Sequence, residues 1–239
     1  MKELQEKILE FIDDETEDEE NPFEELKLYL DDFGIQEVQN GFIQFLQFLV
    51  KVANNPHRSP GFFTKIQQLL LLFKDQIKQT LSNSRILRIF ISNKPLLFFL
   101  IKEEIYIPDR NLVYTLNNDK YKISKYFQYF YPEFNSFYDK KMKEEVEEQY
   151  KELISYGIDA FNKQREEGEN DLTICSMIRN DSIDDFITYI NEKSIKLNGT
   201  IDPSIYESNN YLMTKNPSLI EYSAFFGSLQ ILKFLSLSK

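Results

Sequence analysis

The chain has 239 residues, 42% of them hydrophobic, which is enough apolar material for one or two packed domains and excludes a chain disordered throughout. Its net charge of −11 opposes nucleic acid, whose phosphates need local positive charge. Glycine and proline are scarce, with 7 and 8 residues, while Leu, Ile, Phe, Lys and Glu recur in long patterns. The composition therefore predicts an all-α fold.

Two amphipathic helices flank an acidic block at the start of the chain. Apolar spacing predicts a first helix over residues 4–12, and Asn21-Pro22 opens a second helix that Gly34 ends. Between them lies Asp13–Glu20, which contains no glycine and therefore does not fit a calcium loop of the EF-hand kind. We interpret the block as a solvated linker; the alternative is an acidic binding site for basic proteins.

A third helix, with a wide apolar stripe over residues 42–53, leads into the loop N-N-P-H-R-S-P-G at residues 54–61. The loop contains His57, the only histidine of the chain. No serine elbow, Gly-rich phosphate loop or H-E-x-x-H pair accompanies it, and no second histidine is present to share a metal. We therefore predict no catalytic residue, no cofactor and no metal, and expect His57 and Arg58 to fix the loop.

Short helices joined by tight turns continue through the middle of the chain. Ser82-Asn83-Ser84 marks a break and a new cap, and Asp109 can cap a later helix. Their lengths and turns resemble stacked helical hairpins in an α-solenoid-like arrangement. The predicted helices of this region cover residues 62–81, 85–91, 95–104, 110–116 and 121–130.

Aromatic residues crowd the segment Tyr121–Tyr138, which raises the alternative of base stacking on single-stranded nucleic acid. A local basic cluster lies nearby: Lys120, Lys122, Lys125, Lys140, Lys141 and Lys143. Because the net charge is negative, we expect no nucleic-acid partner. The highly charged segment 139–169 predicts an exposed helix that rests on the core by a narrow edge including Gly157, with a coiled coil as the alternative.

The last stretch, residues 216–235, reads N-P-S-L-I-E-Y-S-A-F-F-G-S-L-Q-I-L-K-F-L and predicts a pair of helices. Asn216 can cap the first helix, with Pro217 at its first position. Gly227 can take the left-handed conformation that ends this helix, and a second apolar helix follows. Such a pair cannot bury its apolar face alone, so it implies stacked neighbours.

This stretch resembles an ankyrin repeat, whose T-P-L-H-x-A-A-x-x-G pattern aligns without gaps on residues 218–227. Ser223 replaces an alanine and keeps the small volume that lets adjacent inner helices pack closely. Leu219 and Glu221 replace the proline and the histidine of the family, so the hydrogen-bonding role of that histidine is not carried over.

A degenerate copy lies upstream, where residues 181–189 align without gaps on residues 227–235, 46 positions later. Ankyrin repeats recur at about 33 residues, and an inserted helix over residues 203–214, opened by Asp202-Pro203, accounts for the excess. The copy departs from the pattern because Asp181 replaces the glycine, and Met177 and Ile178 replace the small pair.

The resemblance implies a binding module for a protein partner, with no catalysis. We expect an N-terminal all-helical region (1–165) and an ankyrin-repeat region (170–239), the latter made of a degenerate repeat (170–192), the inserted helix and a clear repeat (216–236). In the family, partners meet turn tips and exposed inner-helix positions, which here are Lys215, Asn216, Tyr222 and Phe225. The alternative for Tyr222 and Phe225 is packing against a neighbouring helix.

Cys175 is the only cysteine, which excludes an internal disulfide and a Cys-rich zinc site. The N-terminus carries acids where a signal peptide needs an uncharged core, and no apolar run approaches the length of about 20 residues needed to span a bilayer. We therefore expect an intracellular, cytoplasmic protein without membrane contact. Because the chain stops after an outer helix without a polar capping repeat, we also predict self-association or a longer array.

Overall fold

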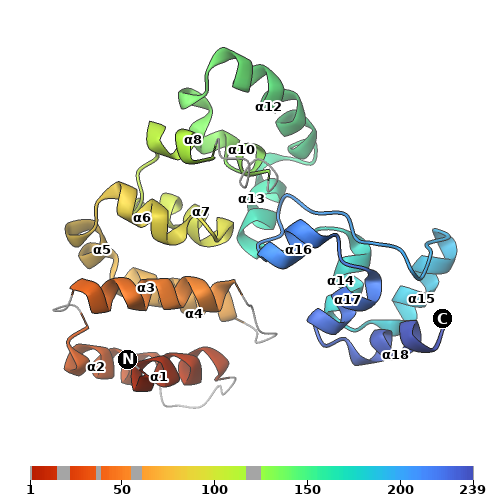
Figure 1. Ribbon diagram of the computed structural model, residues 1–239, viewed down its shortest axis with the longest axis horizontal. Helices are drawn as coiled ribbons and strands as arrows, with labels where there is room; N and C mark the ends of the chain where they lie inside the picture. The colour runs from red at the N-terminus through yellow and green to blue at the C-terminus, as the bar shows by residue number, and fades with distance from the viewer. Residues whose placement is uncertain (1, 15–21, 36–38, 55–60, 117–124, 239) are drawn as a thin grey trace. The chain divides into compact units, whose positions relative to one another are not determined.

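The computed structural model describes residues 2–14, 22–35, 39–54, 61–116 and 125–238. Its regular elements are all helical, apart from one isolated antiparallel bridge between Thr200 and Ser218, so the all-α prediction is confirmed for these residues. Three features singled out in the sequence lie outside the described residues: most of the acidic block Asp13–Glu20, His57, and the start of the aromatic segment Tyr121–Tyr138. The chain divides into two compact units, residues 1–108 and 109–239 (Figure 1). The expected boundary near residues 165–170 stays a prediction.

The first unit is built from layers of paired helices. Figure 1 shows α1 and α2 in one layer, α3 and α4 in the next, and α6 and α7 in a third. The described helices of this unit are α1 (Lys2–Asp13), α2 (Pro22–Phe33), α3 (Gln39–Ala53), α4 (Phe62–Leu72), α5 (Lys74–Thr80), α6 (Asn83–Phe90) and α7 (Lys94–Lys102). Gly34, at a φ of 62°, ends α2 as expected, because a residue without a Cβ adopts this left-handed conformation at low cost.

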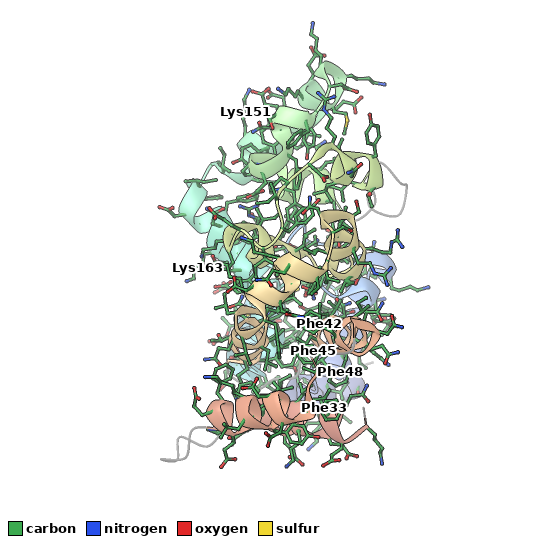
Figure 2. The ribbon with its side chains drawn as sticks, turned by 90° about the vertical axis from the view of Figure 1, so that its left-hand side faces the viewer. Phe33, Phe42, Phe45, Phe48, Lys151 and Lys163 are labelled. Carbon is green, nitrogen blue, oxygen red and sulfur yellow. The ribbon has the colours of Figure 1, made fainter. Side chains whose placement is uncertain are left out.

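The predicted single helix over residues 62–81 is wrong, because Phe73 separates α4 from α5. The backbone of Phe73 leaves the helical region, with φ −101° and ψ 14°. Its ring packs edge-on against Phe42 and Phe45, with centroids 5.5 and 5.2 Å away. Figure 2 labels these two phenylalanines, which lie on α3. We infer that burial of this ring against α3 compensates for the interrupted helix.

Side-chain caps fix where the next helices begin. Ser82 accepts a hydrogen bond from the Arg85 backbone N–H at the start of α6, which confirms the predicted cap. Asn93 is fully buried and accepts from the Leu96 N–H at 2.9 Å, at the start of α7. Its side-chain amide also donates to Oδ1 of Asn54 in the turn after α3, so one buried residue joins two layers.

The second unit contains helices of very different lengths. Its described members are α8 (Arg110–Leu116), α10 (Tyr126–Tyr129), α11 (Tyr131–Phe134), the 3-10 turn η1 (Asn135–Phe137), α12 (Lys140–Leu153), α13 (Ile158–Glu167), α14 (Thr173–Arg179), α15 (Ile183–Glu192), α16 (Asn210–Lys215), α17 (Leu219–Phe225) and α18 (Leu229–Leu237).

The predicted continuous helix over residues 139–169 is also wrong, because α12 ends at Leu153 and α13 begins at Ile158. Gly157 separates them at a φ of 101°, a conformation that other residues adopt only at a cost. Gly157 is therefore a break and not part of a helical stripe. Gly168, at a φ of 68°, ends α13 as expected.

The helix predicted over residues 203–214 begins at Asn210, so Asp202-Pro203 does not open it. Asn209 is its cap, accepting from the Tyr211 N–H at 2.9 Å. The preceding segment has no regular secondary structure and is tied to the turn before α14: Ser204 Oγ donates to Asp171, and the Ser208 N–H donates to the Gly168 carbonyl. These contacts and the burial of residues 205–209 outweigh the local helix signal of the Asp-Pro pair.

Candidate functional site

Helices α14 and α15 form a hairpin that α17 and α18 repeat 46 residues later. Thr173 and Leu219 start the first helices of the two hairpins, and Ile183 and Leu229 start the second ones. The turns also match, because Asp181 and Gly227 are both left-handed, with φ 52° and 61°. In each turn the next residue donates to a carbonyl five positions earlier, from Ser182 to Met177 and from Ser228 to Ser223. The sequence repeat is thus a structural repeat.

The two hairpins pack side by side, α14 against α17 and α15 against α18 (Figure 1). Ser223 lies fully buried in α17, where its hydroxyl donates to the Leu219 carbonyl at 2.7 Å. The shared core consists of Ile174, Cys175, Ile178, Phe186, Ile190, Ile201, Leu212, Leu219, Tyr222, Ile231 and Leu235. Ser223 is thus a small, buried residue of the helix that packs against α14.

Polar side chains in the turns of the two hairpins link one hairpin to the other. The carboxylate of Asp181 accepts from the backbone N–H groups of Gln230 and Ile231, at 3.1 Å each, in the first turn of α18. The hydroxyl of Ser228 donates to the carbonyl of Ile178 in α14. Negative charge at a helix N-terminus is favourable, so the Asp181 carboxylate stabilises the start of α18, at a position where the ankyrin pattern has glycine.

Arg179 and Tyr222 form a second link between the hairpins. Arg179 Nη1 donates to the Asn170 carbonyl at 2.9 Å and to the Tyr222 hydroxyl at 3.0 Å, and its Nε pairs with Glu169 at 2.7 Å. Burial raises the pKa of Tyr222 far above its usual value, so the hydroxyl stays protonated at neutral pH. The link therefore joins a cationic guanidinium to a neutral phenol.

The four predicted contact residues divide into exposed and buried ones. Lys215 and Asn216 are exposed at the end of α16, and Phe225 is 37% exposed at the end of α17. Tyr222 is fully buried, so its assignment to the contact surface is corrected and the alternative of interior packing holds. The reason is its position in α17, which turns the ring into the core shared with α14.

Tyr211, which the sequence analysis missed, joins this surface. Tyr211 is 43% exposed, and its ring lies nearly parallel to that of Phe225, with an interplanar angle of 9° and centroids 6.4 Å apart. No repeat signal marks Tyr211, because it belongs to the inserted segment and has no counterpart in the ankyrin pattern. The exposed surface thus combines Tyr211, Lys215, Asn216 and Phe225, which we call the α16–α17 surface.

The start of α17 also corrects the sequence analysis. Asn216 is left-handed, at a φ of 44°, and ends α16 instead of capping α17. Ser218 is the cap: its hydroxyl accepts from the Glu221 N–H, while the Glu221 carboxylate accepts from the Ser218 N–H at 2.8 Å. This reciprocal pair was readable from the sequence as Ser followed three positions later by Glu.

A buried arginine was not found from the sequence. Arg165 of α13 is 1% exposed and forms a two-pronged ion pair with Glu133, at 2.9 and 3.0 Å. Its guanidinium lies over the rings of Tyr129 and Phe161, and its Nη1 donates to the Tyr129 carbonyl. The arginine is thus held on several sides by protein groups, as expected of a structural ion pair.

The cysteine offers no accessible nucleophile in this conformation. Cys175 is fully buried in the core of the hairpins, and burial raises the pKa of its thiol to about 12. A thiol reacts as the thiolate, so Cys175 stays unreactive at neutral pH while the hairpins are folded.

Residues 2–14, 22–35, 39–54, 61–116 and 125–238 are the part of the chain that the structure describes. Among them, no group of three or more His, Cys, Asp and Glu side chains is placed to hold a metal ion. No helix in the same ranges is both long and apolar enough to cross a membrane. Comparison with known proteins gives no matching family model, no matching curated protein and no matching solved structure.

Proposed function

We propose that this chain is an ankyrin-type interaction module that binds a protein partner through the α16–α17 surface. The 46-residue repeat of the hairpins, with its matching left-handed turns, supports the ankyrin interpretation. The parallel rings of Tyr211 and Phe225 support the choice of surface, because exposed aromatic residues are enriched among residues that dominate binding energy. The proposal assigns the chain no catalytic role and places it inside the cell.

The surface suits a partner that inserts an apolar group between polar neighbours. Two rings that are already stacked lose little conformational freedom on binding. Lys215 and Asn216, exposed at the other end of α16 from Tyr211, would supply a positive charge and hydrogen-bonding groups at the rim.

The experiment is affinity capture with the intact chain as bait, compared with the double variant Tyr211→Ala/Phe225→Ala. We expect a protein captured by the intact chain to be lost with the double variant. The matched control is Tyr156→Ala, because Tyr156 is 92% exposed and lies in the turn before Gly157. Equal capture by all three baits would refute the choice of surface, provided circular dichroism confirms that each variant is folded.

The distribution of charge favours a second candidate function, the binding of a basic protein by the first two helices. Residues 1–34 hold three Lys and 14 Asp and Glu, so their net charge of −11 equals that of the whole chain. Residues 35–239 hold 25 basic and 25 acidic side chains. On α2, Leu28 is 66% exposed and is accompanied by four exposed carboxylates, Glu24, Glu25, Asp31 and Asp32.

Neutralising α2 tests this second function. We expect Glu24→Gln/Glu25→Gln/Asp31→Asn/Asp32→Asn, or removal of Asp13–Glu20, to weaken capture of a basic partner, and added salt to do the same. The control neutralises four exposed acids of α12, namely Glu144, Glu145, Glu148 and Glu152. Equal losses from α2 and α12 would show a dependence on net charge alone.

Self-association is a separate prediction, and a strictly monomeric species in concentrated sedimentation experiments would contradict it.

A further inference from the structure

The dipeptide Asn-Gly occurs twice in this chain, in two different backbone settings. Asn40-Gly41 lies in the first turn of α3. Asn198-Gly199 lies in the turn between α15 and α16, and the Asn198 side chain is exposed. Glycine after asparagine leaves the next backbone nitrogen unhindered and the chain free to rotate, so this pair is chemically the most reactive context for an asparagine.

We propose that Asn198 is a site of spontaneous deamidation, and that isoaspartate formed there releases the start of α17. The backbone nitrogen of Gly199 attacks the side-chain carbonyl carbon of Asn198 and gives up its proton. A new C–N bond closes a succinimide ring, the bond to the side-chain nitrogen breaks, and that nitrogen takes up the proton and leaves as ammonia. Water then opens the ring at one of its two carbonyls, which yields aspartate or isoaspartate.

The hydrogen bonds of the turn gate this reaction. The Gly199 N–H donates to the Lys196 carbonyl at 2.9 Å, so the attacking nitrogen is engaged while the turn is closed. The Gly199 carbonyl accepts from the Leu219 N–H at 3.2 Å, and the Ile201 N–H donates to the Pro217 carbonyl at 2.8 Å. Ring closure therefore requires local opening of the junction between residues 199–201 and 217–219, at a free energy below that of global unfolding.

The product alters the same junction. Isoaspartate adds one methylene group to the main chain between residues 198 and 199. The Gly199 carbonyl can then no longer keep its place opposite Leu219, nor Thr200 its bridge to Ser218. Since Ser218 caps α17, the change loosens that helix and, with it, the ring of Phe225. The modification is thus a one-way change that goes beyond the proposed binding function.

The first experiment ages the intact protein at neutral pH and follows both asparagines by peptide mapping and isoaspartate methylation. We expect Asn198 to deamidate at least about tenfold faster than Asn40, the factor that a difference of about 1.4 kcal/mol in opening free energy produces. The variant Ser218→Ala should accelerate the reaction at Asn198 and leave Asn40 unchanged. Ser82→Ala is the matched control, because it removes the cap of α6 instead.

The second experiment separates the isoaspartate form and compares hydrogen exchange in α17 with that of the unmodified protein and of Asn198→Asp. Faster exchange at residues 219–225 is expected in the isoaspartate form alone. Equal deamidation at Asn40 and Asn198 would overturn the assignment of the site. A rate at Asn198 that Ser218→Ala leaves unchanged would overturn the gate, and unaltered exchange in α17 would overturn the release of the helix.

Discussion

Asp181 illustrates how one residue can serve two needs at a turn. At a φ of 52° its backbone is left-handed, a conformation that aspartate tolerates better than most residues because its short polar side chain can bond locally. Glycine would adopt the turn at lower cost but would bring no acceptor. The carboxylate of Asp181 instead caps α18, which belongs to the other hairpin.

Substitutions at Asp181 separate these two contributions. We expect Asp181→Ala to lower the free energy of unfolding by about 1–2 kcal/mol, because it loses the cap and keeps a strained backbone. Asp181→Gly should cost less than Asp181→Ala, since glycine relieves the strain. Urea denaturation measures both. A larger loss for glycine than for alanine would contradict the strain argument.

The ion pair of Arg165 makes a prediction about which partner can be removed. Glu133→Ala leaves a buried cation without its counter-charge, and we expect a loss of about 3 kcal/mol. Arg165→Met keeps much of the volume between Tyr129 and Phe161 and removes the charge, so it should cost less. Denaturation of both variants and of the double variant gives the coupling energy. Equal losses from the two single variants would contradict this expectation.

At the scale of the element, α17 depends on the pair Ser218 and Glu221. Ser218→Ala should destabilise the protein by about 1 kcal/mol, as expected for loss of a helix cap. Hydrogen bonds from the backbone and hydroxyl of Ser218 lower the pKa of Glu221. Its stabilising effect is therefore present above the pKa of the unfolded chain and lost as the pH falls through the lower folded value. Glu221→Gln should reduce this loss of stability in acid, as measured by denaturation across the acidic range.

The sequence predicted helix ends well where a short polar side chain makes the cap. The helix expected over residues 110–116 is found as α8, because Asp109 accepts from the N–H groups of Asn111 and Leu112. Breaks decided by tertiary packing were missed. Nothing local marks Phe73, whose ring meets two residues of α3 that lie about 30 positions earlier in the chain.

The candidate surface was predictable to a similar extent. Sequence comparison gave the repeat with its 46-residue spacing and, through the resemblance to an ankyrin repeat, the exposed positions of Lys215, Asn216 and Phe225. It could not decide that Tyr222 is buried, because that depends on which face of α17 meets α14. It also could not find Tyr211, whose stacking depends on the irregular path of residues 202–209 before α16.

At the scale of the whole molecule, buried acids predict the response to alkaline pH. Burial raises the pKa of the Cys175 thiol from about 9 to about 12, and that of Tyr206 from about 10 to about 12. At a pH between its two pKa values, each group is therefore neutral in the folded protein and ionised in the unfolded chain. Their stabilising effect is complete below the unfolded pKa values and is lost as the pH rises toward about 12.

We expect the free energy of unfolding to fall through this alkaline range, and Cys175→Ala to reduce the slope by at most about 1.4 kcal/mol per pH unit. Denaturation at several pH values measures the slope. The thiol should also react with a thiol reagent only as fast as the hairpins open. Rapid modification of the folded protein would contradict its burial.

Acidic and basic side chains are distributed unevenly over the layers of the first unit. In the described residues, the layer of α1 and α2 (2–14 and 22–34) holds nine acidic and three basic side chains, a net charge of −6, whereas the rest of the unit (35, 39–54 and 61–108) holds eight basic and three acidic side chains, a net charge of +5. Separated charges of opposite sign make the unit a strong electric dipole. In water, the field of such a dipole acts before contact, so a cationic protein would be attracted first to the negative end, which α1 and α2 form. Ionic strength should then act mainly on the rate of encounter and less on the lifetime of the complex.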